Sequence, residues 1–183
     1  LSEIGKDVEA DHPMARLLQG DVGSGKTFVA FAAVALFASA KRQSAVMAPT
    51  ELLARQHADN AARILEPLGI RLAFYSGSVS AKSRRPLLQA LAAGEIDLII
   101  GTHALFSDDV VFKDLAFVVI DEQHRFGVSQ RNRLAAKGLY PDVLVMSATP
   151  IPRTLALSAF GDMDVSELKT MPPGRKPIET HRA

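Results

Sequence analysis

The sequence has no cysteine and no tryptophan, and only 6% of its 183 residues are aromatic. Without cysteine, the chain forms neither disulfides nor thiolate metal sites, as expected of a protein in a reducing cytoplasm. Its five histidines are scattered and show no metal-ligand spacing. The composition therefore excludes a disulfide-stabilised secreted domain and argues against a zinc site.

Long apolar runs are also missing. The richest run, residues 28–40, has only 13 residues and is rich in alanine. A membrane-spanning helix needs about 20 apolar residues, so this run predicts a packed core helix. The first residues do not form a signal peptide. We therefore expect no membrane partner and a cytoplasmic location.

Neither sign of charge is in excess, because 21 Lys and Arg face 20 Asp and Glu. The net charge of +1 does not by itself indicate a nucleic-acid binder. A local basic cluster, Lys82, Arg84 and Arg85, either contacts DNA or is a solvated face, as most such clusters are. The chain of 183 residues is long enough for one globular α/β core, and 48% of its residues are hydrophobic and can fill that core.

A complete phosphate-binding loop, GDVGSGKT, directly follows the apolar pair Leu17 and Leu18. Its glycines allow the backbone to wrap closely around a polyphosphate, and Lys26 reaches the β- and γ-phosphates. Thr27 can hold Mg²⁺, so ATP and Mg²⁺ are the expected cofactors. A glycine-rich turn with a surface lysine is the alternative, but the flanking strand and helix patterns disfavour it. The nucleotide-binding residues are Gly20, Asp21, Val22, Gly23, Ser24, Gly25, Lys26 and Thr27.

A second apolar strand ends in two adjacent carboxylates. Asp121 can bind Mg²⁺ through water, and Glu122, which points the other way along the strand, can polarise the water that attacks the γ-phosphate. An isolated pair of this kind would more often be a solvated strand end, but the phosphate loop reverses that preference. Gln123 and His124 can form hydrogen bonds near the γ-phosphate, or cap the following turn.

Strand and helix patterns alternate along the chain, which predicts a mostly parallel, doubly wound sheet with helices on both faces. The expected strands are 16–19, 45–48, 72–75, 98–101, 117–121 and 144–147, with a possible seventh at 164–168. The expected helices are 27–40, 51–65, 81–93, 129–137 and 153–160. The phosphate loop and the carboxylate pair both follow strand ends, where open α/β sheets bind ligands.

Five segments occur in the order seen in superfamily 2 helicases, namely GDVGSGKT, APTELLARQH (48–57), GTHALF (101–106), DEQHRFGV (121–128) and SATPIPRTL (147–155). The chain resembles the first motor lobe of these enzymes. The resemblance implies a RecA-like P-loop NTPase domain over residues 1–170 and a linker, 171–183, toward a second RecA-like domain. It also implies catalytic roles for Lys26, Asp121, Glu122, Gln123 and His124.

Within the superfamily, the chain looks like a bacterial, monomeric helicase that remodels branched DNA such as stalled replication forks. Forked duplex DNA and a wedge domain of the same parent chain are then its partners. The alternative is the motor lobe of a transcription-repair coupling factor. Those proteins usually have phenylalanine at the position of Ser24 and glutamate at that of Gln123, so both residues favour the fork helicase.

Further strand-end loops could connect ATP to a nucleic acid. Helix starts bind phosphates without reading base sequence, although ordinary N-capping by Thr50 and Thr102 is the simpler interpretation. The expected DNA contacts are Pro49, Thr50, Glu51, Gly101, Thr102 and His103. The expected coupling residues are Ser147, Ala148, Thr149 and Arg153, whose first members could bond to the DEQH residues in one nucleotide state.

Two other classes of function share some of these sequence features. A nucleotide-binding module without catalysis would describe a single lobe, because neither a glutamine motif nor an arginine finger is visible in the chain. A P-loop kinase is disfavoured, because the APTELL and SAT segments would then have no role.

Overall fold

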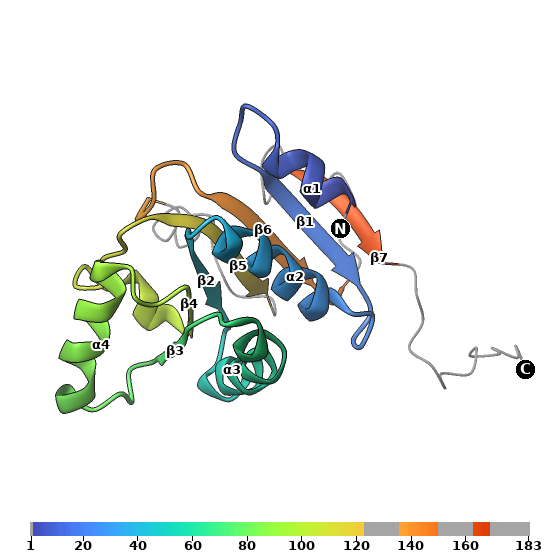
Figure 1. The fold of residues 1–183 in the computed structure, drawn as a ribbon. Helices are drawn as coiled ribbons and strands as arrows, with labels where there is room; N and C mark the ends of the chain where they lie inside the picture. The colour runs from blue at the N-terminus through green and yellow to red at the C-terminus, as the bar shows by residue number, and fades with distance from the viewer. Residues whose placement is uncertain (1, 123–135, 150–162, 169–183) are drawn as a thin grey trace, which may run out of the picture.

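The computed structural model describes residues 2–122, 136–149 and 163–168, and within them the chain forms one seven-stranded sheet (Figure 1). The strand order is β3-β4-β2-β5-β6-β1-β7, and every pairing is parallel. All seven expected strands are confirmed to within two residues at each end. They are β1 Ala15–Gly20, β2 Gln43–Met47, β3 Leu72–Tyr75, β4 Leu98–Gly101, β5 Leu115–Glu122, β6 Asp142–Ser147 and β7 Asp164–Leu168.

Three of the expected helices are present, namely α2 Lys26–Ser39, α3 Glu51–Leu65 and α4 Ala81–Ala93. The short helices α1 Ser2–Val8, η1 Glu66–Leu68 and η2 His103–Phe106 were not expected. The predicted helix 153–160 and the linker 171–183 lie outside the described residues. Most of the predicted helix 129–137 does too, and its last two residues lie in a turn.

Helices cover both faces of the sheet (Figure 1). One core joins α1, α2 and α3 to alternate residues of the central strands, and the other joins α4 and η2 to the residues between them. In β4, Leu98 and Ile100 belong to the first core, and Ile99 belongs to the second. The strands are apolar on both sides, as a sheet between two helical layers requires.

Strand β5 contains one extra residue. Gln43 pairs with Leu115, but the next residue of β2, Ser44, pairs with Phe117. Ala116 is therefore a bulge, which shifts the alternation of side chains beyond it. From this point Phe117 and Val119 face α2 and α3. Asp121, two residues further, falls on the same face of the strand.

Arg16 of β1 holds helix α1 and the outermost strand β7 against the sheet. Its guanidinium is almost fully buried and donates hydrogen bonds to Asp7 of α1 at 2.5 Å and to Ser166 of β7 at 2.7 Å. The Asp7 carboxylate is the main reason why the pKa of Arg16 is raised. Helix α1 also buries Ile4 in the first core. These tertiary contacts, and not helix length, hold α1 in place.

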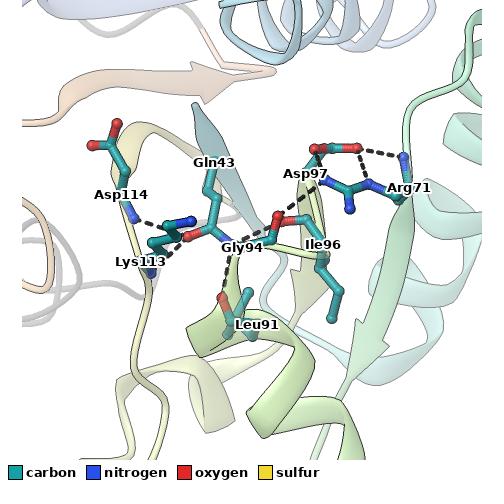
Figure 2. A network of polar contacts seen from close by, with 8 residues as sticks. All are labelled: Gln43, Arg71, Leu91, Gly94, Ile96, Asp97, Lys113 and Asp114. Atoms are coloured by element: carbon teal, nitrogen blue, oxygen red, sulfur yellow. Dashed lines mark hydrogen bonds and ion pairs between the residues drawn. The ribbon is translucent and has the colours of Figure 1, made fainter. Parts of the chain in front are cut away.

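The amino ends of the strands are joined by the side chain of Gln43, which is 3% exposed (Figure 2). Its Nε2 donates to the carbonyls of Leu91 at 2.9 Å and Ile96 at 2.8 Å. Its Oε1 accepts from the backbone N–H groups of Lys113 at 2.8 Å and Asp114 at 3.0 Å. The buried amide thus uses its full hydrogen-bonding capacity to join the end of α4 and the loop before β4 to the segment before β5.

Replacing Gln43 with leucine should lower the free energy of unfolding by about 2–4 kcal/mol, because four backbone groups lose their hydrogen bond to the buried amide. Denaturant unfolding monitored by circular dichroism measures the change. The exposed Gln89 of α4 is the matched control, and Gln89→Leu should stay within about 0.5 kcal/mol of the wild type. Equal stability of the two variants would contradict this role of Gln43.

Candidate nucleotide site

The phosphate loop joins the end of β1 to the start of α2. Gly23 and Gly25 have φ angles of 83° and 95°, in the left-handed region that favours glycine. Gly25 is the N-cap of α2 and provides no side-chain hydrogen bond to the helix. Because glycine has no side chain, the first N–H groups of α2 are left uncapped at this position, and an anion can accept their hydrogen bonds.

The loop is tightly packed at Gly20. A Cβ atom at this position would lie 2.6 Å from the Ser24 Oγ and 3.1 Å from the carbonyl oxygen of Leu168. The Ser24 Oγ is itself buried and has no hydrogen-bond partner within the described part of the chain. The chain thus encloses a hydroxyl inside the phosphate loop, and the role of Gly20 and Ser24 in nucleotide binding stays a prediction.

Lys26 lies across the same loop. Its Nζ donates to the carbonyls of Gly20 at 2.5 Å and Asp21 at 2.8 Å. Partial burial lowers the pKa of Lys26, against the opposing effect of the carboxylates of Asp121 and Asp21. A partly desolvated ammonium binds phosphate oxygens more strongly than one in water does.

Asp121 ends β5 on the side of the sheet that carries α2 and α3. Its Oδ2 lies 2.6 Å from the Nε2 of His57 in α3. Its charge also reaches Lys26, so the ends of β1 and β5 are confirmed to lie near each other. The contact with His57 was missed from the sequence. The sequence did contain a signal for this contact. His57 falls on the same side of α3 as Ala54, Ala61 and Leu65, so it is a polar residue in an otherwise apolar row.

Of the other predicted catalytic and coupling residues, some lie within the described part of the chain and some do not. Glu122 is the last residue of β5, and it pairs in register with Ser147 of β6. Gln123 and His124 lie outside the described residues, as does Arg153. The pairing brings the backbone of Glu122 beside the start of the Ser-Ala-Thr segment. The catalytic and coupling roles of these residues remain predictions.

Ser147 is the last residue of β6, and Ala148 and Thr149 follow it in a bend. The Ser147 Oγ accepts from the Thr149 N–H at 3.3 Å and donates to the Thr149 carbonyl at 3.1 Å. Ser147 is buried and the next two residues are half-buried. The hydroxyls of this bend therefore lie within the structure at the ligand edge of the sheet, where a small rearrangement would change their partners.

The expected DNA-contacting residues follow β2 and β4 at the same edge. After Pro49, Thr50 caps α3 by accepting from the Leu53 N–H at 3.3 Å. Glu51 accepts from the Ser78 Oγ at 2.6 Å, and this bond is the main cause of its lowered pKa. The capping interpretation is thus correct for Thr50, and the helix start keeps its other N–H groups.

The second of these loops begins at Gly101. A Cβ there would lie 2.1 Å from the Tyr75 carbonyl oxygen, so only glycine lets β3 approach this closely. Thr102 is buried and, unlike Thr50, makes no side-chain cap for the short helix that follows. His103 opens that helix and is exposed. The two loops present different groups at one edge of the sheet.

Within the described residues, no group of three or more histidine and carboxylate side chains gathers into a metal cage. Magnesium needs no such cage, because it keeps water ligands and shares substrate phosphates. Thr27 in the first turn of α2 and Asp121 near the end of β5 carry oxygen atoms of the kind that Mg²⁺ binds. No helix in the described ranges is long and apolar enough to cross a membrane.

The family model described as DEAD/DEAH box helicase matches residues 5–157. The chain therefore belongs to the DEAD/DEAH box helicase family. It is similar to the ATP-dependent DNA helicase RecG of Treponema pallidum, with 58% identity over 100% of this chain and 28% of the relative. RecG of Bacillus subtilis is 56% identical over 99% of this chain and 26% of its own length.

A solved structure of RecG bound to a three-way DNA junction superimposes with a TM-score of 0.82 and 46% identity, over 97% of this chain and 24% of that one. The chain thus spans about a quarter of the length of the RecG proteins it matches. The similarity confirms the branch of the superfamily that Ser24 and Gln123 indicated. The transcription-repair coupling factor Mfd, the alternative, is not favoured.

In the full-length protein, replacing Lys26 with alanine should weaken nucleotide binding by roughly 10–100-fold, because the phosphates lose a charge-assisted hydrogen bond. Glu122→Gln should keep nucleotide binding and lose hydrolysis. Titration with a fluorescent ATP analogue, together with phosphate release, separates the two effects. Lys6→Ala, on the exposed face of α1, is the control and should bind like the wild type. Equally poor binding by both site variants would show that Glu122 serves binding.

Proposed function

We propose that the chain is the ATP-binding motor lobe of an ATP-dependent DNA helicase that remodels branched DNA, such as stalled replication forks and recombination intermediates. The observation that carries the proposal is that the phosphate loop with Lys26 and the strand end with Asp121 lie at the same carboxyl edge of a parallel sheet, close enough for the two charges to interact. Membership of the helicase family and the similarity to RecG support it. Repair and recombination, in a bacterial cytoplasm, are the processes such an enzyme serves.

The proposed chemistry gives each of these residues one role. Thr27 and Asp121 would hold Mg²⁺, which neutralises charge on the β- and γ-phosphates and orients them. Lys26 would exchange the Gly20 and Asp21 carbonyls for phosphate oxygens. Glu122 would polarise the attacking water. Gln123 and His124 would report the state of the γ-phosphate.

The nucleic-acid track would lie along the same edge. The helix start at Thr50 and the loop from Gly101 to His103 would contact the phosphate backbone of DNA, which gives affinity without sequence specificity. Ser147, Ala148, Thr149 and Arg153 would couple these contacts to the nucleotide. The second RecA-like domain of a monomeric parent would close the ATP cleft, and a wedge domain would recognise the fork.

A single lobe can also act as a nucleotide-binding module without catalysis. The described residues provide one wall of an ATP site, and an arginine from another lobe contributes about 10³–10⁵-fold in rate in related phosphoryl-transfer enzymes. Steady-state ATPase assays on this chain and on the full-length protein, each with and without forked DNA, distinguish the two functions.

This chain alone should hydrolyse ATP slowly and show no stimulation by forked DNA. Its DNA binding should be weak and should fall steeply between about 50 and 200 mM salt, because few phosphate contacts remain. Phosphate release and fluorescence anisotropy measure the two properties. Robust fork-stimulated hydrolysis by a verified monomer of these 183 residues would contradict the two-lobe mechanism.

A further inference from the structure

His57 is a polar residue on the core-facing side of α3. Its buried neighbours on that side are Ala54, Ala61 and Leu65, and His57 itself is 8% exposed. A leucine at this position would bury apolar surface and would need no hydrogen-bond partner, whereas a buried imidazole does need one. Packing of α3 on the sheet therefore does not explain the histidine.

The partner of His57 is the candidate metal ligand Asp121. The Nε2 and Oδ2 atoms lie 2.6 Å apart, and the two side chains are 10% and 21% exposed. An ionised carboxylate only accepts hydrogen bonds, so Nε2 carries the proton in this contact. A hydrogen bond to Oδ2 fixes the rotation of the carboxylate and so determines where its Oδ1 points.

The donor comes from a helix that is itself held firmly. At the start of α3, Glu51 accepts from Ser78 of the loop after β3 and from Arg55 one turn further. The Arg55 guanidinium lies 4.5 Å from the centre of the Phe74 ring. His57, two residues after Arg55, is thus presented from a rigid element, as precise orientation of a ligand requires.

We propose that His57 is a positioning residue, which holds Asp121 in the orientation that receives Mg²⁺ with ATP. The proposal rests on the proposed nucleotide site. Carboxylate ligands are commonly oriented by hydrogen bonds from neighbouring side chains, and loss of such a partner lowers metal affinity by about 10–100-fold. His57 would contact neither ATP nor the reacting water.

The test uses the full-length helicase and binding of a fluorescent ATP analogue as Mg²⁺ is titrated. His57→Leu fills the position but removes the donor, and His57→Gln keeps an N–H donor of similar reach. The Mg²⁺ concentration for half-maximal binding should rise about 10-fold or more in His57→Leu. It should stay within about 3-fold of wild type in His57→Gln, and binding without Mg²⁺ should be unchanged in both variants.

The exposed His12 supplies the control, because His12→Leu removes a histidine far from the site and should match the wild type. Thermal melting verifies folding of each variant. If His57→Leu does not fold, His57→Asn replaces it, since the shorter amide falls short of Asp121 and should raise the Mg²⁺ requirement where His57→Gln does not.

Three results overturn the proposal. A folded His57→Leu with the wild-type Mg²⁺ requirement would show that His57 only packs. An equal rise in His57→Leu and His57→Gln would show that the donor is not what matters. Binding of the analogue by the wild type without any Mg²⁺ dependence would overturn the assignment of the metal site itself, and with it the role of His57.

Discussion

The candidate site depends on which face of the sheet each side chain of β5 points to, which we call the phase of the strand. Ala116 adds one residue to the strand, and every side chain beyond it changes face. With this phase, Asp121 faces α2 and α3, where Lys26 and His57 approach it. A shift of one residue would turn Asp121 toward α4 and separate it from both.

The two edges of the sheet carry different kinds of polar group. At the amino ends of the strands, Gln43 satisfies four backbone groups, and Arg71 pairs with Asp97 at 2.6 Å (Figure 2). These closed networks fix the strands. At the carboxyl ends, the start of α2 has no side-chain cap and the Ser24 hydroxyl has no partner among the described residues. The uncapped start of α2 is the feature of the carboxyl edge that suits a bound anion.

Much of the fold could be predicted because its strands are apolar and the turns between them are distinct. All seven strands and the helices that start at Lys26, Glu51 and Ala81 agree with the expected ranges. Helix α1 could not be predicted, because seven residues are too few for a stable isolated helix and its position depends on Arg16. The bulge at Ala116 was also invisible, since an alanine in an apolar strand gives no local signal.

The sequence by itself determined the chemistry of the site and the edge of the sheet on which it lies. The phosphate loop and the Asp-Glu pair each follow a strand, and parallel strands align their carboxyl ends. Only the tertiary structure decided which side chains meet there. His57 and Asp121 are 64 residues apart, and β6 lies between the strands that carry Lys26's loop and Asp121. Strand order and the phase of β5 bring these groups together, and neither is encoded in a local pattern of residues.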